Sequence, residues 1–298
     1  MIRGYGHAFF LTRSHIIKRI TSVLIILCIS VALQGQSLIP ELVFNHPLLK
    51  TGKGCSEAGQ DGAVYIFANV GWGIDALVQI QGRSSGEVQL SDPDIAGPEE
   101  NAAAGQGYED AWQPLVTYAD GHAPAHCSWW MEFRISFVKH VNHQVPLAVK
   151  QFFVSGLDID GDGNQLHEYQ SYYKVQSFTL ERQTGIFASS VTGSEMDPML
   201  KGKRFDGPTT DYPGLQFNAE DAMVSNFYTG SNSLVVRLGA ETGSAGSAKT
   251  KRMYALLFKS LAFDVPSNPL PVNLVAENGN TIPVNLIAAN GYTNKKAD

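Results

Sequence analysis

Cysteine, charge and long apolar runs are all scarce in this chain of 298 residues, and each scarcity excludes a class of protein. Cysteine occurs only 3 times, which excludes a disulfide-rich scaffold. Charged residues make up 17% of the sequence, too few for a disordered polyelectrolyte. The longest apolar run, residues 20–33, is short for a membrane span and is interrupted by Thr and Ser. Long helical periodicity is also missing, which argues against an all-α fold.

Acidic residues are absent from the N-terminal segment, where the first one is Glu41. Basic residues occur there instead, and an apolar stretch follows from Val23 to Leu33. Small and polar residues come next, at 34–37. This order is typical of a secretory signal peptide. We therefore predict a signal peptide over residues 1–36 and a secreted or cell-surface mature chain without a membrane span.

The predicted mature chain is acidic. The whole chain has 22 basic and 28 acidic residues, and four basic residues but no acidic ones lie in 1–36. The mature part therefore has 18 basic and 28 acidic residues, a net charge of −10. This charge argues against nucleic acid and anionic membranes as partners and suits a divalent cation.

Two cysteines remain after removal of the signal peptide, Cys55 and Cys127. An even pair in an oxidising compartment favours one disulfide, Cys55–Cys127. The alternative is a pair of free thiols, because a domain of this size does not need a covalent cross-link.

Short segments rich in β-branched and aromatic residues alternate with Gly, Asn, Asp, Ser and Pro, the pattern of an all-β protein. In residues 131–139 the alternation places Phe133, Ile135 and Phe137 on one buried face. We predict an antiparallel β-sandwich or jelly roll of about ten strands, with a turn-rich segment at Thr192–Gly214. The predicted strands are Gly62–Asn69, Ile74–Gln81, Glu87–Leu90, Trp129–Lys139, Ala148–Leu157, Tyr169–Glu181, Gly185–Ser190, Ala222–Tyr228, Ser233–Leu238 and Arg252–Phe263.

The predicted organisation is one calcium-stabilised β-sandwich domain over 37–265, followed by a Pro-rich linker and a short β tail over 266–298. The tail contains a duplication, because Pro271–Gly279 and Pro283–Gly291 are similar. Each copy reads as an apolar strand ending in Asn-Gly, a hairpin turn signal.

The segment Asp158–Asn164 is the strongest functional signal in the sequence. It has Asp at three alternate positions, and Gly163 provides a sharp turn. Alternate carboxylates repel one another unless a cation lies between them, and oxygen ligands are what Ca²⁺ prefers. The later positions and the strand-like flanks do not fit an EF-hand, so we predict a structural calcium site that joins two strands. The alternative is an acidic turn without a bound ion. The predicted ligands are Asp158, Asp160, Asp162, Asn164 and Glu168.

Two weaker groups of residues are compatible with other functions. His122, His126 and Cys127 could contribute to a zinc site, although Pro124 prevents a helix that would align the two histidines. The four tryptophans could form a sugar-stacking platform, although most aromatics of an all-β domain lie in its core. His140 and His143 flank a predicted turn. The tryptophans are Trp72, Trp112, Trp129 and Trp130.

Several of these segments together resemble the β-rich module of secreted or cell-surface, adhesin-like proteins of Bacteroidetes-type bacteria, which are type IX secretion substrates. The resemblance covers roughly residues 60–265, and within the matching segment Leu157–Gly161 its most specific part is Asp158–Gly161. In that family a further β domain and a C-terminal sorting domain commonly follow. This chain ends at Asp298, so we expect no sorting domain. The other matching segments are Val64–Val70, Gly73–Ile80, Tyr108–Pro114, Phe133–Val138 and Arg252–Phe258.

These observations predict a structural or adhesive β-sandwich module at the cell surface or outside the cell, stabilised by calcium. Its partner would be a surface or polysaccharide ligand. A carbohydrate-binding module that uses exposed aromatics is the first alternative. A hydrolase or metalloenzyme is the second, but we find no phosphate-binding glycine loop and no convincing catalytic pair, so the sequence favours a non-enzymatic role.

Overall fold

The computed structural model describes residues 39–95, 108–119, 121–267, 272–275 and 281–284. The predicted signal peptide lies outside the described residues. The described part holds nineteen strands and one short 3-10 helix, Glu220–Ala222. Every strand pairing is antiparallel. The prediction of an all-β antiparallel sandwich is confirmed, and the strands are more numerous than the ten expected.

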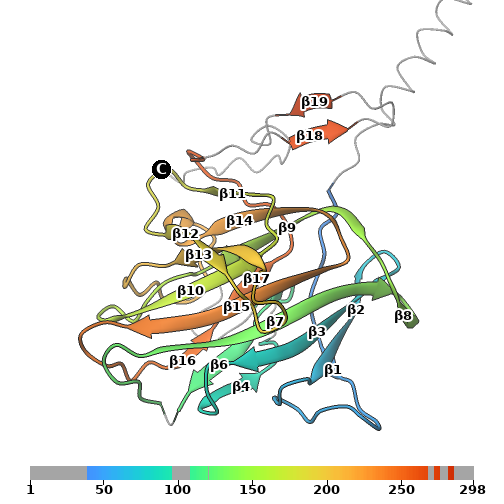
Figure 1. Ribbon diagram of the computed structural model, residues 1–298. Coiled ribbons are helices and arrows are strands. Elements are labelled where there is room, and N and C mark those ends of the chain that lie inside the picture. The colour runs from blue at the N-terminus through green and yellow to red at the C-terminus, as the bar shows by residue number, and fades with distance from the viewer. Residues whose placement is uncertain (1–38, 96–107, 120, 268–271, 276–280, 285–298) are drawn as a thin grey trace, which may run out of the picture. The chain divides into compact units, whose positions relative to one another are not determined.

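The large sheet has nine strands in the order β1-β2-β3-β7-β15-β10-β13-β12, with β8 paired to β7 (Figure 1). Its strands are β1 (Leu48–Leu49), β2 (Val64–Gly71), β3 (Ile74–Arg83), β7 (Ser128–Lys139), β8 (Asn142–Pro146), β10 (Leu166–Tyr173), β12 (Phe187–Thr192), β13 (Lys201–Asp206) and β15 (Ser233–Thr242).

Two smaller sheets complete the main unit. The small sheet has five strands in the order β11-β14-β9-β17-β5, and the third sheet has three in the order β16-β6-β4. The small sheet consists of β5 (Ala111–Trp112), β9 (Val149–Leu157), β11 (Ser177–Leu180), β14 (Val224–Ser231) and β17 (Ala255–Leu257). The third sheet consists of β4 (Val88–Asp92), β6 (Leu115–Tyr118) and β16 (Lys251–Met253).

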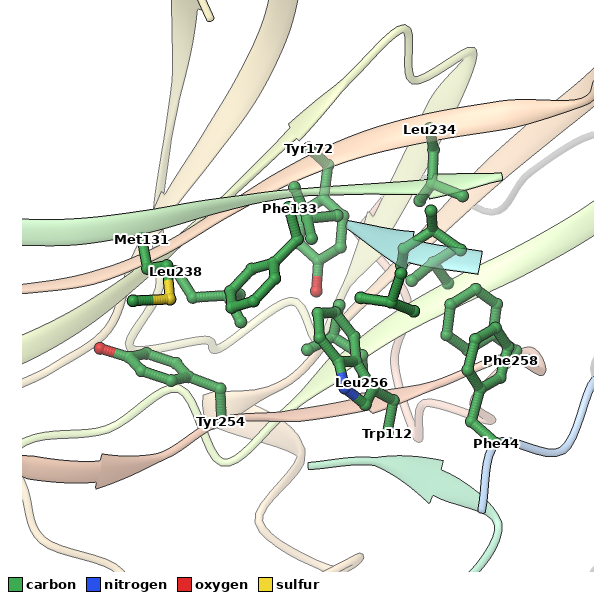
Figure 2. Close-up of a cluster of buried hydrophobic side chains, with 14 of the residues drawn as sticks. Phe44, Trp112, Met131, Phe133, Tyr172, Leu234, Leu238, Tyr254, Leu256 and Phe258 are labelled. Atoms are coloured by element: carbon green, nitrogen blue, oxygen red, sulfur yellow. The ribbon is translucent and has the colours of Figure 1, made fainter. Parts of the chain in front are cut away.

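The core lies between the large and the small sheet. The predicted alternation in β7 is confirmed, because Phe133, Ile135 and Phe137 are all buried on its inner face. Phe133 packs edge-on against Trp112 of β5, with ring centroids 5.0 Å apart, and Phe137 packs edge-on against Phe152 of β9 at 5.2 Å. Figure 2 shows side chains of β7, β10 and β15 pointing toward those of β5 and β17.

Two predicted strands are in fact pairs of strands that pass from one sheet to another. Tyr169–Glu181 contains β10 of the large sheet and β11 of the small sheet, separated by a corner at which Lys174 has a left-handed φ of 60°. Arg252–Phe263 contains β16 of the third sheet and β17 of the small sheet. A continuous run of β-forming residues does not distinguish one long strand from two strands joined by a corner.

The turn-rich prediction for Thr192–Gly214 was wrong in its centre, where β13 lies between β10 and β12. Lys201, Lys203 and Arg204 make this strand polar, and none of the three side chains is buried. Its one fully buried side chain, Phe205, packs edge-on against Tyr172 and Phe178. A strand with a single buried anchor gives a weak sequence signal.

The C-terminal tail contributes a separate hairpin of β18 (Val272–Val275) and β19 (Thr281–Val284). The strand expected in the first copy of the duplication corresponds to β18. Its partner β19 is formed half by the two residues before the second copy and half by the first two residues of that copy, with Val272 opposite Val284. The rest of the second copy lies outside the described residues. Among the residues that the structure describes, no helix has the length and apolar character needed to cross a bilayer.

Candidate cation site

The acidic loop connects β9 of the small sheet to β10 of the large sheet, so it crosses from one layer of the sandwich to the other. Gly163 has a φ of +78°, which supports the turn expected there. Gly161 allows a close backbone approach, because a Cβ atom there would lie 2.4 Å from the Leu166 carbonyl oxygen and 2.5 Å from Thr209 Cα. The loop backbone is fixed by bonds from the Gly161 and Gly163 N–H groups to the Thr210 and Thr209 carbonyls.

An arginine that we did not predict lies among the acidic side chains. The Arg252 guanidinium, from β16, is 2.5 Å from Asp160 Oδ1 through Nη2 and 2.5 Å from Glu168 Oε1 through Nε. The side chains of Asp160 and Glu168 are only 3% and 1% exposed. Asp160 comes from the crossover loop and Glu168 from β10. These charge-assisted bonds therefore connect the third sheet to the large sheet and to the loop that leaves β9 of the small sheet, at one buried point.

The cluster has more negative than positive charge. Asp158 belongs to it electrostatically, and its Oδ1 is buried without a hydrogen-bond partner, as is Oε2 of Glu168. Burial and the neighbouring charges of Asp160 and Glu168 raise the pKa of Asp158 to about 9. Burial raises the pKa of Glu168 to about 8, and that of Asp160 to about 6 against the opposing charge of Arg252. Without a further cation, the cluster thus retains protons well above the usual carboxyl range.

The structure separates the other two predicted ligands from this cluster. Asp162 Oδ1 accepts hydrogen bonds from the N–H groups of Asn164, Gln165 and Leu166, and its Oδ2 accepts one from the Ser247 hydroxyl. These bonds lower the pKa of Asp162 although partial burial opposes them. Asn164 is exposed. Asp162 thus acts as an Asx cap of its own loop, and Asn164 contributes its backbone to that turn.

Asp158, Asp160 and Glu168 therefore form the part of the predicted ligand set that comes together, with Arg252 among them. Within the described residues, no group of three or more His, Cys, Asp or Glu side chains has an arrangement that could hold a metal ion. The guanidinium already bonds two carboxylates, but two buried oxygens still lack a partner. Calcium at this loop stays a prediction, and the unpartnered oxygens are what would attract it.

Cys55 and Cys127 are both free, so the predicted disulfide is not supported. Cys55 is exposed in the turns before β2. The Cys127 thiol lies beside the Tyr118 side chain instead. A hydrogen bond between the two raises the pKa of Tyr118. His122 and His126 are exposed and form no metal-binding group with Cys127 in the described part of the chain.

A buried carboxylate organises one end of the large sheet. Asp75 of β3, which is 2% exposed, accepts hydrogen bonds from the Asn69 N–H and from both His140 and His143. The two histidine bonds are 2.8 and 2.7 Å long. Although burial opposes it, these bonds lower the pKa of Asp75. The sequence places the two histidines at a turn, but nothing in it links them to Asp75, which is more than 60 residues away.

The four tryptophans do not form a platform. Trp112 and Trp129 are buried in the core, and the Arg237 guanidinium covers the Trp130 ring at 4.0 Å from its centroid. Trp72 is the exception. It lies in the β2–β3 turn and is 101% exposed.

A second exposed apolar side chain lies in the neighbouring turn. Val141, between β7 and β8, is 84% exposed. The two turns are adjacent, because Ile74 pairs with Lys139 and the His140 N–H donates to the Gly73 carbonyl at 2.9 Å. We call these two turns, Gly71–Ile74 and Lys139–Asn142, the tip.

No family model matches the sequence, and no curated protein matches it. Among solved structures, one similar chain is the crystal structure of the N-terminal domain of the Streptococcus gordonii adhesin Sgo0707. The TM-score is 0.40 and the identity 13%, over 76% of this chain. The match spans 60% of the length of the adhesin chain.

Proposed function

We propose that this protein is a secreted or cell-surface β-sandwich module that adheres to a surface through its tip. The observation that carries the proposal is the pair of exposed apolar side chains, Trp72 and Val141, on two adjacent turns at one end of the large sheet. Exposed tryptophan is unfavourable in water and is enriched where proteins contact partners.

The backbone at the tip supports this role. Val141 has a φ of 70°, a left-handed conformation that is costly for a β-branched residue. Gly or Asn would relieve the strain, and the exposed valine gains no packing in return. A residue that is both strained and exposed is explained by a contact outside the molecule. The Asp75 hydrogen bonds to His140 and His143 hold the β7–β8 turn in place for that contact.

Stabilisation by calcium is the second element of the proposal. It is supported by the excess of buried carboxyl groups over cations in the cluster and by the unpartnered oxygens of Asp158 and Glu168. The ion would be held by Asp158 and Glu168, with Asp160 shared with Arg252. Its role would be structural, because the cluster connects the large sheet, the third sheet and the loop between β9 and β10.

Carbohydrate binding is a second candidate, favoured by the full exposure of the Trp72 indole, which could stack on a sugar ring. The two functions differ in the surface that is bound. A sugar-binding module is retained on polysaccharide only, whereas an apolar adhesive tip is also retained on protein.

Replacing Trp72 with alanine should reduce adhesion at least tenfold, because a central tryptophan typically contributes about 2 kcal/mol or more to a contact. Beads coated with the mature chain would be passed over a neutral polysaccharide film and over a collagen film, and retained beads counted. The matched control is Phe187→Ala, which removes an aromatic side chain that is 70% exposed on β12, at the opposite edge of the large sheet.

Retention on either film that is lost in Trp72→Ala but kept in Phe187→Ala supports the tip as the adhesive surface. Retention on polysaccharide alone favours the carbohydrate-binding function. Equal retention of both variants, or failure of the unmodified beads to bind either film, would overturn the proposal.

A further inference from the structure

The outer face of the large sheet is partly covered by the loop between β12 and β13, residues 193–200. The Gly193 carbonyl accepts a bond from the Tyr173 hydroxyl at 2.7 Å, and the Glu195 N–H donates to Glu132 Oε1 at 2.8 Å. Glu132 itself is buried by the loop although it points away from the core. The loop thus forms a fixed wall above β7 and β15.

A pocket of about 170 Å³ lies between this wall and the sheet. Its apolar lining comes from Met196 and Leu200 of the loop and from Val235 of β15. Arg134 of β7, directly opposite Val235 in the strand register, and Lys174 at the β10–β11 corner supply positive charge. The pocket therefore combines an apolar wall with two cationic side chains.

Arg134 differs from most other arginines of the described chain. Arg83, Arg204, Arg237 and Arg252 each form an ion pair with a carboxylate. Neither Arg134 nor Lys174 has a side-chain hydrogen bond or ion pair within the described residues.

The pocket lining also includes one carboxylate, which already accepts a hydrogen bond within the loop. Asp197 lies in its lining, and its Oδ1 accepts the Met199 N–H at 2.8 Å, which closes the turn of the loop. The site therefore has a net positive charge in a protein whose overall charge is negative. A partly enclosed guanidinium without an anion is a ready site for one.

We propose that this pocket binds a small organic carboxylate with a short apolar body. The planar Arg134 guanidinium fits a carboxylate in a two-bond geometry, and Lys174 adds a second charge. Met196 is flexible and can pack on apolar groups of different shape. The volume is below the 300–1,000 Å³ typical of pockets for drug-sized ligands, so the body is limited to a few carbon atoms. A free acid and the C-terminus of a peptide share this chemistry.

The test uses N-acetyl-leucine and its uncharged amide, N-acetyl-leucinamide, titrated into the mature chain and followed by NMR chemical shifts. We expect saturable shifts for the acid and at least tenfold weaker binding of the amide. Arg134→Gln should weaken binding of the acid at least tenfold. Its melting temperature should stay nearly unchanged, because the Arg134 side chain has no hydrogen bond or ion pair within the described residues. Arg182→Gln, at an exposed arginine outside the pocket, is the matched control and should bind normally.

A pentapeptide ending in leucine, with a free or an amidated C-terminus, distinguishes the two sources of the carboxylate. Tighter binding of the free peptide than of N-acetyl-leucine identifies a chain end as the ligand, whereas weaker binding identifies a free small acid. Equal affinity for acid and amide, or unchanged binding in Arg134→Gln, would overturn the proposal. Inorganic phosphate that competes as well as the acid would also overturn it, because the apolar wall would then have no role.

Discussion

Replacing Arg252 with methionine should lower the free energy of unfolding by about 3–5 kcal/mol at pH 8, the range found when one partner of a buried ion pair is removed. Methionine keeps much of the side-chain volume but leaves Asp160 and Glu168 without their cation. Both carboxylates are almost fully buried, so water cannot replace the guanidinium. The loss should be smaller at pH 5, where the carboxylates are protonated. Urea denaturation at the two pH values measures both effects.

The matched control for this variant is Lys259→Met. Lys259 pairs with Glu41 at 3.0 Å, but both side chains are substantially exposed, and such surface pairs contribute about 0–1 kcal/mol. Adding Glu168→Gln to Arg252→Met should recover part of the stability, because it removes one of the stranded charges. A loss below about 1 kcal/mol for Arg252→Met would show that the cluster does not connect the sheets as described.

The metal-free protein should become less stable as the pH rises, by several kcal/mol between pH 5 and pH 9. Asp158, Asp160 and Glu168 have folded-state pKa values above their ordinary values, at about 9, 6 and 8. The folded state therefore binds more protons than the unfolded state over this range. Their contribution is fully present below about pH 4 and is lost as the pH passes each folded-state value.

Calcium should oppose this loss, because the ion replaces the protons as the partner of the carboxylates. Melting temperatures would be compared in excess chelator and in millimolar calcium, at pH 5.5 and pH 8. We expect a larger rise with calcium at pH 8, and the rise should weaken in Asp158→Asn. Identical melting curves at pH 8 would reject calcium and leave Arg252 as the cation of the cluster. A chelator-treated protein as stable at pH 9 as at pH 5 would contradict the proton-loaded cluster itself.

Local patterns in the sequence predicted most of the fold. The alternation in residues 131–139 identified β7 and its buried face, because the two faces of a strand have different environments. The corners between β10 and β11 and between β16 and β17 were not predicted, because a chain that changes sheets keeps the same β-forming residues. β13 was missed because a mostly polar strand with a single buried residue has the same composition as a polar loop.

The candidate site was predicted only in its local part. Three alternate aspartates drew attention to the loop, but Asp162 serves its own turn and Arg252, 92 residues from Asp160, enters from another sheet. The same limit applies to Asp75 and its two histidines, and to Trp72 and Val141 at the tip. These residues come close only because β3 lies beside β7, and a long-range strand pairing cannot be read from a single sequence.

The adhesive tip is the central claim, and Val141→Asn tests it most directly because stability and adhesion should change in opposite directions. Asn tolerates the φ of 70° better than Val does, so the melting temperature should rise, by the equivalent of about 1 kcal/mol. Retention of coated beads should fall, because an apolar contact is lost, while Val141→Ile should change neither quantity. Higher stability with undiminished retention would contradict the account, since the strained valine would then have no role in binding.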